Sequence, residues 1–117
     1  MNINIDYGIR EPIYEQIVKQ IEKQITLGVL KPDEQIPSVR TLAYDLGINP
    51  NTVKKAYDIL EENGLIISKS TKGTFIGNNI KQAKEQKVEE LISKINDLVS
   101  ELKNYEITKE EIIKRMK

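Results

Sequence analysis

Apolar residues recur at helical spacing along most of this chain. Within residues 12–27 an isoleucine occupies every fourth position from Ile13 to Ile25, and Gly28 follows as a helix-ending residue. The stretches 38–47 and 49–64 show the same one-sided pattern. Their apolar positions are Val39, Leu42, Ala43 and Leu46 in the first and Val53, Ala56, Tyr57 and Leu60 in the second. The pattern predicts three amphipathic helices whose apolar faces share one core.

The second and third predicted helices are joined by a very short connection. Ser38 is a good N-cap for the second helix, and Gly47 can adopt the left-handed conformation that ends it. Asn49 and Pro50 supply a cap and a first-turn residue for the third helix. Helices joined this closely cannot lie antiparallel, so they cross as a helix-turn-helix. In such motifs the start of the second helix enters the major groove, and here that start carries Asn51, Thr52, Lys54 and Lys55.

A small β-hairpin is predicted directly after this motif. Residues 65–68 and 74–76 favour strands, and residues 70–73 favour a turn. A hairpin in this place is a wing, which would bring Lys69 and Lys72 to the phosphate backbone, while Gly73 permits a close approach. The alternative is that both lysines are ordinary solvated turn residues. In the connection before Ser38, Leu30 is expected to add a short third strand to the wing sheet.

The C-terminal third carries a second apolar stripe. A helix is predicted over residues 81–104, with an a/d seam of about three heptads. Thr108 and Glu111 form a capping box for a last short helix over residues 109–116. The stripe needs a cover, either this chain's own first helix or a second copy, and two-fold symmetry suits a palindromic DNA site. The expected dimer-interface residues are Val88, Leu91, Ile92, Ile95, Leu98, Val99, Leu102, Tyr105, Ile112, Ile113 and Met116.

Two parts of the chain are separated by a breaker at residues 77–79. Residues 1–77 are expected to form a winged helix-turn-helix domain, and residues 78–117 a helical dimerisation segment. The predicted fold class is mainly α with a small β-hairpin wing.

Composition narrows the chemistry. The 117 residues include no cysteine and no histidine, which excludes disulfides, thiolate chemistry and the usual zinc ligands. Without these residues, catalysis would need a carboxylate pair or a lysine of lowered pKa, and the acidic residues stand singly or on solvent faces. We therefore expect no enzyme, no cofactor and no metal. No apolar run suits a signal sequence or a membrane span, which indicates a soluble cytoplasmic protein with no membrane partner.

Net charge is unusual for a nucleic-acid binder. Eighteen basic residues balance eighteen acidic ones, whereas such proteins usually carry a basic patch. Within residues 38–77 the charges are Arg40, Lys54, Lys55, Lys69 and Lys72 against Asp45, Asp58, Glu61 and Glu62. Placement matters more than the total, because the five cations can share one face. We expect modest non-specific affinity for each subunit and tight binding only from a dimer.

Several short motifs resemble the GntR family of bacterial transcription regulators, and within it the YtrA-like subgroup. The matching segments are 12–17, 28–30, 36–40, 46–53, 56–57, 60–61, 64–66 and 73–76. Many family members carry a basic residue where this chain has Pro50, and the version with Asn49-Pro50-Asn51-Thr52 looks like the YtrA-like branch. The resemblance implies that Arg40, in the Pro-Ser-x-Arg motif, reaches DNA. The alternative for Arg40 is a surface ion pair with Glu34 or Asp45.

We expect a homodimeric DNA-binding regulator that represses a nearby operon and binds an inverted-repeat operator. The resemblance to the YtrA-like branch implies that this operon encodes a membrane transporter. The alternative is a winged-helix protein-interaction module that enriches no DNA sequence. A small-molecule effector stays unknown. The expected DNA-binding residues are Ser38, Arg40, Asn49, Asn51, Thr52, Lys54, Lys55, Lys69, Lys72, Gly73 and Thr74.

Overall fold

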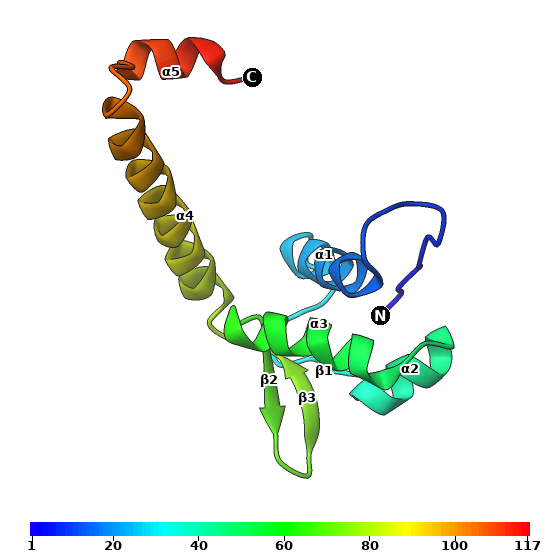
Figure 1. The fold of residues 1–117 in the computed structure, drawn as a ribbon. Coiled ribbons are helices and arrows are strands. Elements are labelled where there is room, and N and C mark those ends of the chain that lie inside the picture. Colours follow the sequence, from blue (N-terminus) through cyan, green and yellow to red (C-terminus); the bar gives the residue numbers. More distant parts are fainter. The chain divides into compact units, whose positions relative to one another are not determined.

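Five helices and three short strands form in the computed structural model, which describes residues 1–117 (Figure 1). The chain divides into two compact units, Met1–Ala83 and Lys84–Lys117. None of the helices is long and apolar enough to cross a membrane. In chain order the elements are α1 (Ile13–Thr26), β1 (Gln35–Ile36), α2 (Val39–Leu46), α3 (Pro50–Glu62), β2 (Ile66–Lys69), β3 (Gly73–Ile76), α4 (Ile80–Lys103) and α5 (Lys109–Arg115).

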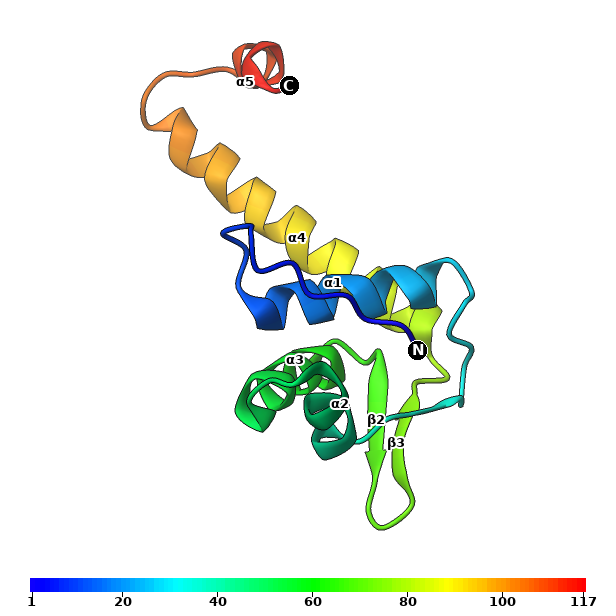
Figure 2. The same cartoon turned by 90° about the vertical axis from the view of Figure 1, so that its right-hand side faces the viewer.

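The core of the first unit is formed by the apolar faces that the spacing predicts. α1 packs on α3, and α2 packs on the other side of the same helix (Figure 2). Ile17 and Ile21 of α1 and Val53 and Leu60 of α3 are fully buried. Ile76 closes the core from the sheet. The fold class is therefore confirmed as mainly helical with a small β wing.

The sheet has three antiparallel strands in the order β1-β3-β2. β2 pairs with β3 from Ile66 opposite Ile76 to Lys69 opposite Gly73. The β2–β3 hairpin projects beyond the helices of the first unit in both views (Figures 1 and 2). It is the wing that the sequence predicts.

The third strand differs from the expectation. Gln35–Ile36 forms β1, whereas Leu30 is a buried core residue outside any strand. A turn separates the two, in which the Glu34 N–H donates to the Lys31 carbonyl (3.0 Å) and Asp33 adopts a φ of +65°. The backbone meets β3 at the end of this turn, where the Asp33 N–H donates to the Ile76 carbonyl (3.0 Å). Leu30 lies before the turn and outside the sheet, so the prediction for Leu30 was wrong.

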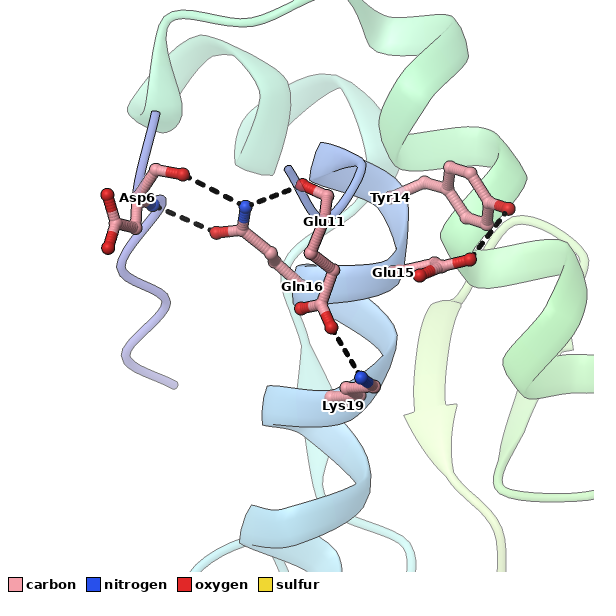
Figure 3. A network of polar contacts seen from close by, with 6 residues as sticks. All are labelled: Asp6, Glu11, Tyr14, Glu15, Gln16 and Lys19. Atoms are coloured by element: carbon pink, nitrogen blue, oxygen red, sulfur yellow. Dashed lines mark hydrogen bonds and ion pairs between the residues drawn. The ribbon is translucent and has the colours of Figure 1, made fainter. Parts of the chain in front are cut away.

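An extended N-terminal arm lies along α1 and is held by three glutamines. Gln24 donates to the Asn2 carbonyl (2.7 Å), and Gln20 both donates to and accepts from the Asn4 backbone. Gln16 does the same for the backbone of Asp6 and also donates to the Glu11 carbonyl (2.9 Å; Figure 3). Four helical residues advance about 6 Å and two extended residues about 6.6 Å, so the two spacings match. The spacing of apolar residues does not predict this arm.

Gln16 is the one polar side chain buried in the core, with 4% of its surface exposed. Its amide makes three hydrogen bonds to backbone groups, which offsets the cost of removing it from water. Glu11 in the same loop also forms an ion pair with Lys19 of α1 (Figure 3). These contacts fix the loop that leads into α1.

The second unit contains most of α4 and all of α5. Thr108 caps α5, accepting from the Glu111 N–H at 3.2 Å, as the capping-box pattern predicts. The reciprocal half of the box is absent, because the Glu111 carboxylate pairs with Arg115 instead (3.2 Å). On α4, Glu90 lies within 4 Å of both Lys87 and Lys94. Such pairs each stabilise a helix by only a few tenths of a kcal/mol.

Candidate nucleic-acid interface

The turn between α2 and α3 is set by local hydrogen bonds. The Ser38 hydroxyl oxygen accepts from the Thr41 N–H at 3.1 Å and caps α2. Gly47 ends α2 with a φ of +66°, and the Ile48 N–H donates back to the Ala43 carbonyl. The Asn49 carboxamide oxygen accepts from the Asn51 N–H at 2.8 Å and caps α3. Ser38 and Asn49 thus act as helix caps in this structure.

Tyr57 fixes α3 against the segment before α2. Its ring is buried in the core and its hydroxyl donates to the Pro37 carbonyl at 2.6 Å. Burial raises the pKa of Tyr57 well above its ordinary value. The hydroxyl ties together two segments twenty positions apart in the sequence and adds to the core packing that holds α2 against α3.

Arg40 and Asn51 are exposed, and their side chains form no hydrogen bond or ion pair in the structure. Arg40 lies in the first turn of α2 and forms no ion pair with Glu34 or Asp45, the alternative considered from the sequence. The Asn51 carboxamide, in the first turn of α3, has no hydrogen-bond partner. Both side chains are therefore free for an external ligand.

The two lysines of α3 are engaged within the protein. Lys54 forms an ion pair with Asp58 one turn later, at 2.9 Å. The Lys55 ammonium lies 3.9 Å from the centre of the Tyr14 ring of α1, in a cation–π contact. Both lysines remain exposed, and Thr52 beside them is half-buried. A phosphate would have to compete with these internal partners.

The wing presents a similar arrangement. The Lys69 ammonium lies 4.7 Å from the centre of the Phe75 ring, while the Lys72 ammonium has no partner. Gly73 has a φ of +120°, and a Cβ there would lie 2.6 Å from the Gln35 amide nitrogen. Thr74 is half-buried in β3. The tip of the hairpin is thus a tight turn with two accessible cations.

Charge is distributed unevenly along α3. Its first half carries Lys54 and Lys55, and its exposed second half carries Asp58, Glu61 and Glu62. An anionic ligand would be attracted to the N-terminal end, where the helix dipole also favours negative charge.

Tyr44 is an exposed aromatic residue of α2 that is absent from the expected DNA-binding residues. It lies one helical turn after Arg40 on α2, and 87% of its surface is exposed. The available signal was its spacing from Arg40 and its place outside the apolar positions of this helix. An aromatic side chain this exposed is not used by the core.

Most of the predicted dimer-interface residues are exposed in the single chain. Val88, Leu91, Ile92, Ile95 and Leu98 of α4 are all exposed, as are Tyr105, Ile113 and Met116. Val99, Leu102 and Ile112 are half-buried. Together these residues form an apolar stripe along α4 that continues into the α5 segment, and we call it the α4 stripe.

Comparisons with known proteins agree with this geometry. Residues 13–76 match the family described as bacterial regulatory proteins, gntR family. The HTH-type transcriptional repressor YtrA of Bacillus subtilis (strain 168) is 46% identical over 79 residues, which span 68% of this chain and 61% of that protein.

Solved structures show the same fold. YtrA from Sulfolobus acidocaldarius, a GntR-family transcription factor, superimposes with a TM-score of 0.69 at 31% identity, over 96% of this chain and 90% of the other. AraR(DBD) in complex with operator ORX1 gives a TM-score of 0.57 at 28% identity, over 66% of this chain and 96% of the other. The resemblance to YtrA-like regulators is therefore confirmed, and these relatives are transcription regulators rather than enzymes. The chain belongs to the gntR family of bacterial regulatory proteins.

Proposed function

We propose that this chain is a homodimeric, sequence-specific DNA-binding repressor of a nearby operon, one related to membrane transport by analogy with the YtrA-like branch. The observation that carries the proposal is the pair of free side chains, Arg40 and Asn51, at the exposed helix-turn-helix. Support comes from the YtrA relative, which is named a repressor, and from AraR(DBD), which was solved with an operator. The chain spans 61% of the length of that YtrA relative.

On duplex DNA, α3 enters the major groove with its N-terminal end first. The Asn51 carboxamide can donate to and accept from one base edge, with adenine as its best partner. The Arg40 guanidinium can bind guanine or a phosphate through two hydrogen bonds. Thr52 reaches a phosphate or a thymine methyl group. Lys54 and Lys55 bind phosphate or guanine after leaving their internal partners.

The wing contacts the DNA outside the major groove. Lys69 and Lys72 at the hairpin tip bind the phosphate backbone or the edge of the minor groove. The positive φ of Gly73 shapes this tip, and Thr74 follows it at the start of β3. Such contacts position the protein without reading sequence.

A dimer formed through the α4 stripe would place two winged domains on one inverted-repeat operator. Five large apolar side chains of α4 are exposed in the single chain, which exceeds what scattered surface residues explain. Two-fold symmetry of the protein then requires two-fold symmetry of the site. An effector that controls binding would act most directly at this interface.

The proposal is tested by selecting duplexes from a randomised library with the purified protein and footprinting the enriched sequence. We expect an inverted repeat with two symmetric protected segments. Arg40→Ala should weaken binding to that duplex by about 1–3 kcal/mol. Arg10→Ala is the matched control, because Arg10 is exposed, unpaired and outside the helix-turn-helix.

Two results would contradict the proposal. No enrichment of any sequence would point to a winged-helix interaction module instead. Equal binding by Arg40→Ala and the unmodified protein would remove Arg40 from the interface.

A further inference from the structure

We propose that a hollow between α2 and the start of α3 is a phosphate-binding site for one backbone unit of the DNA duplex, with Tyr44 and Thr41 as hydroxyl donors beside Arg40. The hollow has a volume of about 730 Å³ and is open to solvent. Its walls include Arg40, Thr41 and Tyr44 from α2 and Pro50 from α3. This inference rests on the proposed function, because it assigns a contact within the same interface.

The polar groups of this hollow suit an anion. Arg40 supplies one positive charge, Thr41 and Tyr44 each supply a hydroxyl, and no carboxylate lines the site. Two other surface hollows of the chain contrast with it, since one contains Glu15 and Glu22 beside a single lysine, Lys19, and the other is lined by acidic residues of α3. A phosphate would meet repulsion in those hollows and three donor groups in this one.

The two hydroxyls are free to donate. The Ser38 hydroxyl donates to the Thr41 oxygen at 3.0 Å, so the Thr41 hydroxyl hydrogen is left for another acceptor. The Tyr44 hydroxyl makes no hydrogen bond in the structure, and 87% of the residue is exposed. Tyr44 and Arg40 are four positions apart on α2, so their side chains leave the same face of the helix.

The position of the hollow fits a backbone contact next to the major groove. It lies directly before the first turn of α3, because Gly47, Ile48 and Pro50 form part of its wall. The first helix of a helix-turn-helix crosses the phosphate backbone while the second enters the groove. The apolar wall atoms can pack against the deoxyribose that carries the phosphate. The occupant is therefore one sugar–phosphate unit flanking the bases read by α3.

The test uses the duplex that the unmodified 117-residue chain selects from a randomised library. Tyr44→Phe removes one hydroxyl from an exposed side chain and should not disturb folding. We expect its affinity for the duplex to fall roughly three- to tenfold, the effect of one lost hydrogen bond. The slope of affinity against salt should not change, because no charge is removed, whereas Arg40→Ala should lower that slope by about one. Tyr7→Phe, at an exposed position outside the hollow, is the matched control.

Neutral methylphosphonate linkages then locate the contact. Each duplex carries one such linkage at a different position. At one position the linkage should strongly lower the affinity of the unmodified protein for the duplex and lower that of Tyr44→Phe much less. Tyr44→Phe binding that equals the unmodified protein, or equal losses for both proteins at every linkage, would overturn the inference while leaving the proposed function intact. If the unmodified protein binds no duplex at all, both fail.

Discussion

At the scale of single residues, polar side chains of the helix-turn-helix divide by their use within the fold. Ser38 and Asn49 act as helix caps, with their side-chain oxygens 3.1 Å and 2.8 Å from the backbone nitrogens that donate to them. Arg40 and Asn51 lie beside them with no internal partner. Replacing a cap costs helix stability of about 1 kcal/mol. A loss of DNA binding after substitution of Ser38 or Asn49 would therefore not identify a DNA contact, whereas one at Arg40 or Asn51 would.

Tyr57 links stability to pH. Tyr57→Phe leaves the Pro37 carbonyl without its donor, so the free energy of unfolding at neutral pH should fall by about 1–2 kcal/mol. Burial raises the pKa of Tyr57 in the folded protein above the unfolded value of about 10. The folded state therefore holds the phenolic proton more tightly. The resulting stability is fully present below about pH 10 and is lost as the pH rises toward the folded pKa.

Denaturant unfolding measured at pH 7 and at several values above pH 10 checks this. Stability of the unmodified protein should decline more steeply with pH than that of Tyr57→Phe, with a difference of up to about 1.4 kcal/mol per pH unit. Tyr7→Phe serves as the control because Tyr7 is exposed. Parallel curves for the unmodified protein and Tyr57→Phe would show that the pKa of the Tyr57 hydroxyl is not raised by folding.

In the proposed complex, Asp58 would compete with DNA for Lys54. The carboxylate lies 2.9 Å from the ammonium, and both groups are more than half exposed. Asp58→Asn should free Lys54 and remove a negative charge from α3, so affinity for random-sequence duplex should rise a few-fold at low salt. Filter binding over a salt series measures this, with Glu22→Gln on α1 as the control. Unchanged binding would mean that the ion pair is too weak to matter, as many surface pairs are.

At the scale of elements, the sequence predicted what local periodicity controls. The three helices of the first unit, the hairpin and the cap of α5 all follow from apolar spacing and from Ser, Thr, Asn, Pro and Gly at the helix ends. Leu30 was assigned to a strand wrongly, because a turn with a positive φ at Asp33 intervenes. β1 is only two residues long, and its pairing with β3 is a tertiary contact. Periodicity cannot reveal a strand of that length.

The same distinction applies to the candidate interface. Asn51 and Arg40 could be placed on an exposed surface from helix spacing alone. The partners of the lysines could not be, because Lys55 meets Tyr14, a residue of a different helix, and Lys69 meets Phe75 across the hairpin. Tyr44 also falls outside the apolar positions of α2, so helix spacing could have placed it on the exposed surface. The hollow that it lines is visible only in the structure.

The glutamines of α1 illustrate a pattern that spacing could have revealed. Gln16, Gln20 and Gln24 recur every fourth residue, like the isoleucines beside them. We expect Gln16→Ala to lower the free energy of unfolding by about 2–3 kcal/mol, since a buried amide and three part-buried hydrogen bonds to the backbone of Asp6 and Glu11 are lost. Gln24→Ala, with one exposed hydrogen bond, should cost less than about 1 kcal/mol. Thermal unfolding of the two variants makes the comparison, and equal losses would contradict a special role for the buried amide.

At the scale of the whole molecule, zero net charge has to be reconciled with DNA binding. One chain offers few free cations at its interface, because Lys54 is paired and Lys55 and Lys69 lie over aromatic rings. Long-range attraction of one subunit to DNA is then weak. Two linked subunits bind more tightly, since the second binding event becomes intramolecular. The proposed dimer would therefore contribute more to affinity than any single contact.

Ile95→Asp tests that dependence. Ile95 lies in the middle of the α4 stripe and is half exposed in the single chain, so the substitution should leave the fold of the monomer intact. In a dimer it would bury two unpaired carboxylates, at a cost of several kcal/mol. Light scattering should give twice the chain mass of 13.4 kDa for the unmodified protein and the single mass for Ile95→Asp. Operator affinity should fall when the dimer is lost, and footprints should weaken at both half-sites.

Ser93→Asp adds the same charge to α4 at a position outside the stripe and should keep both the dimer and the footprint. A dimer that survives Ile95→Asp, or a monomer that binds the full operator with unchanged affinity, would show that the α4 stripe serves another purpose.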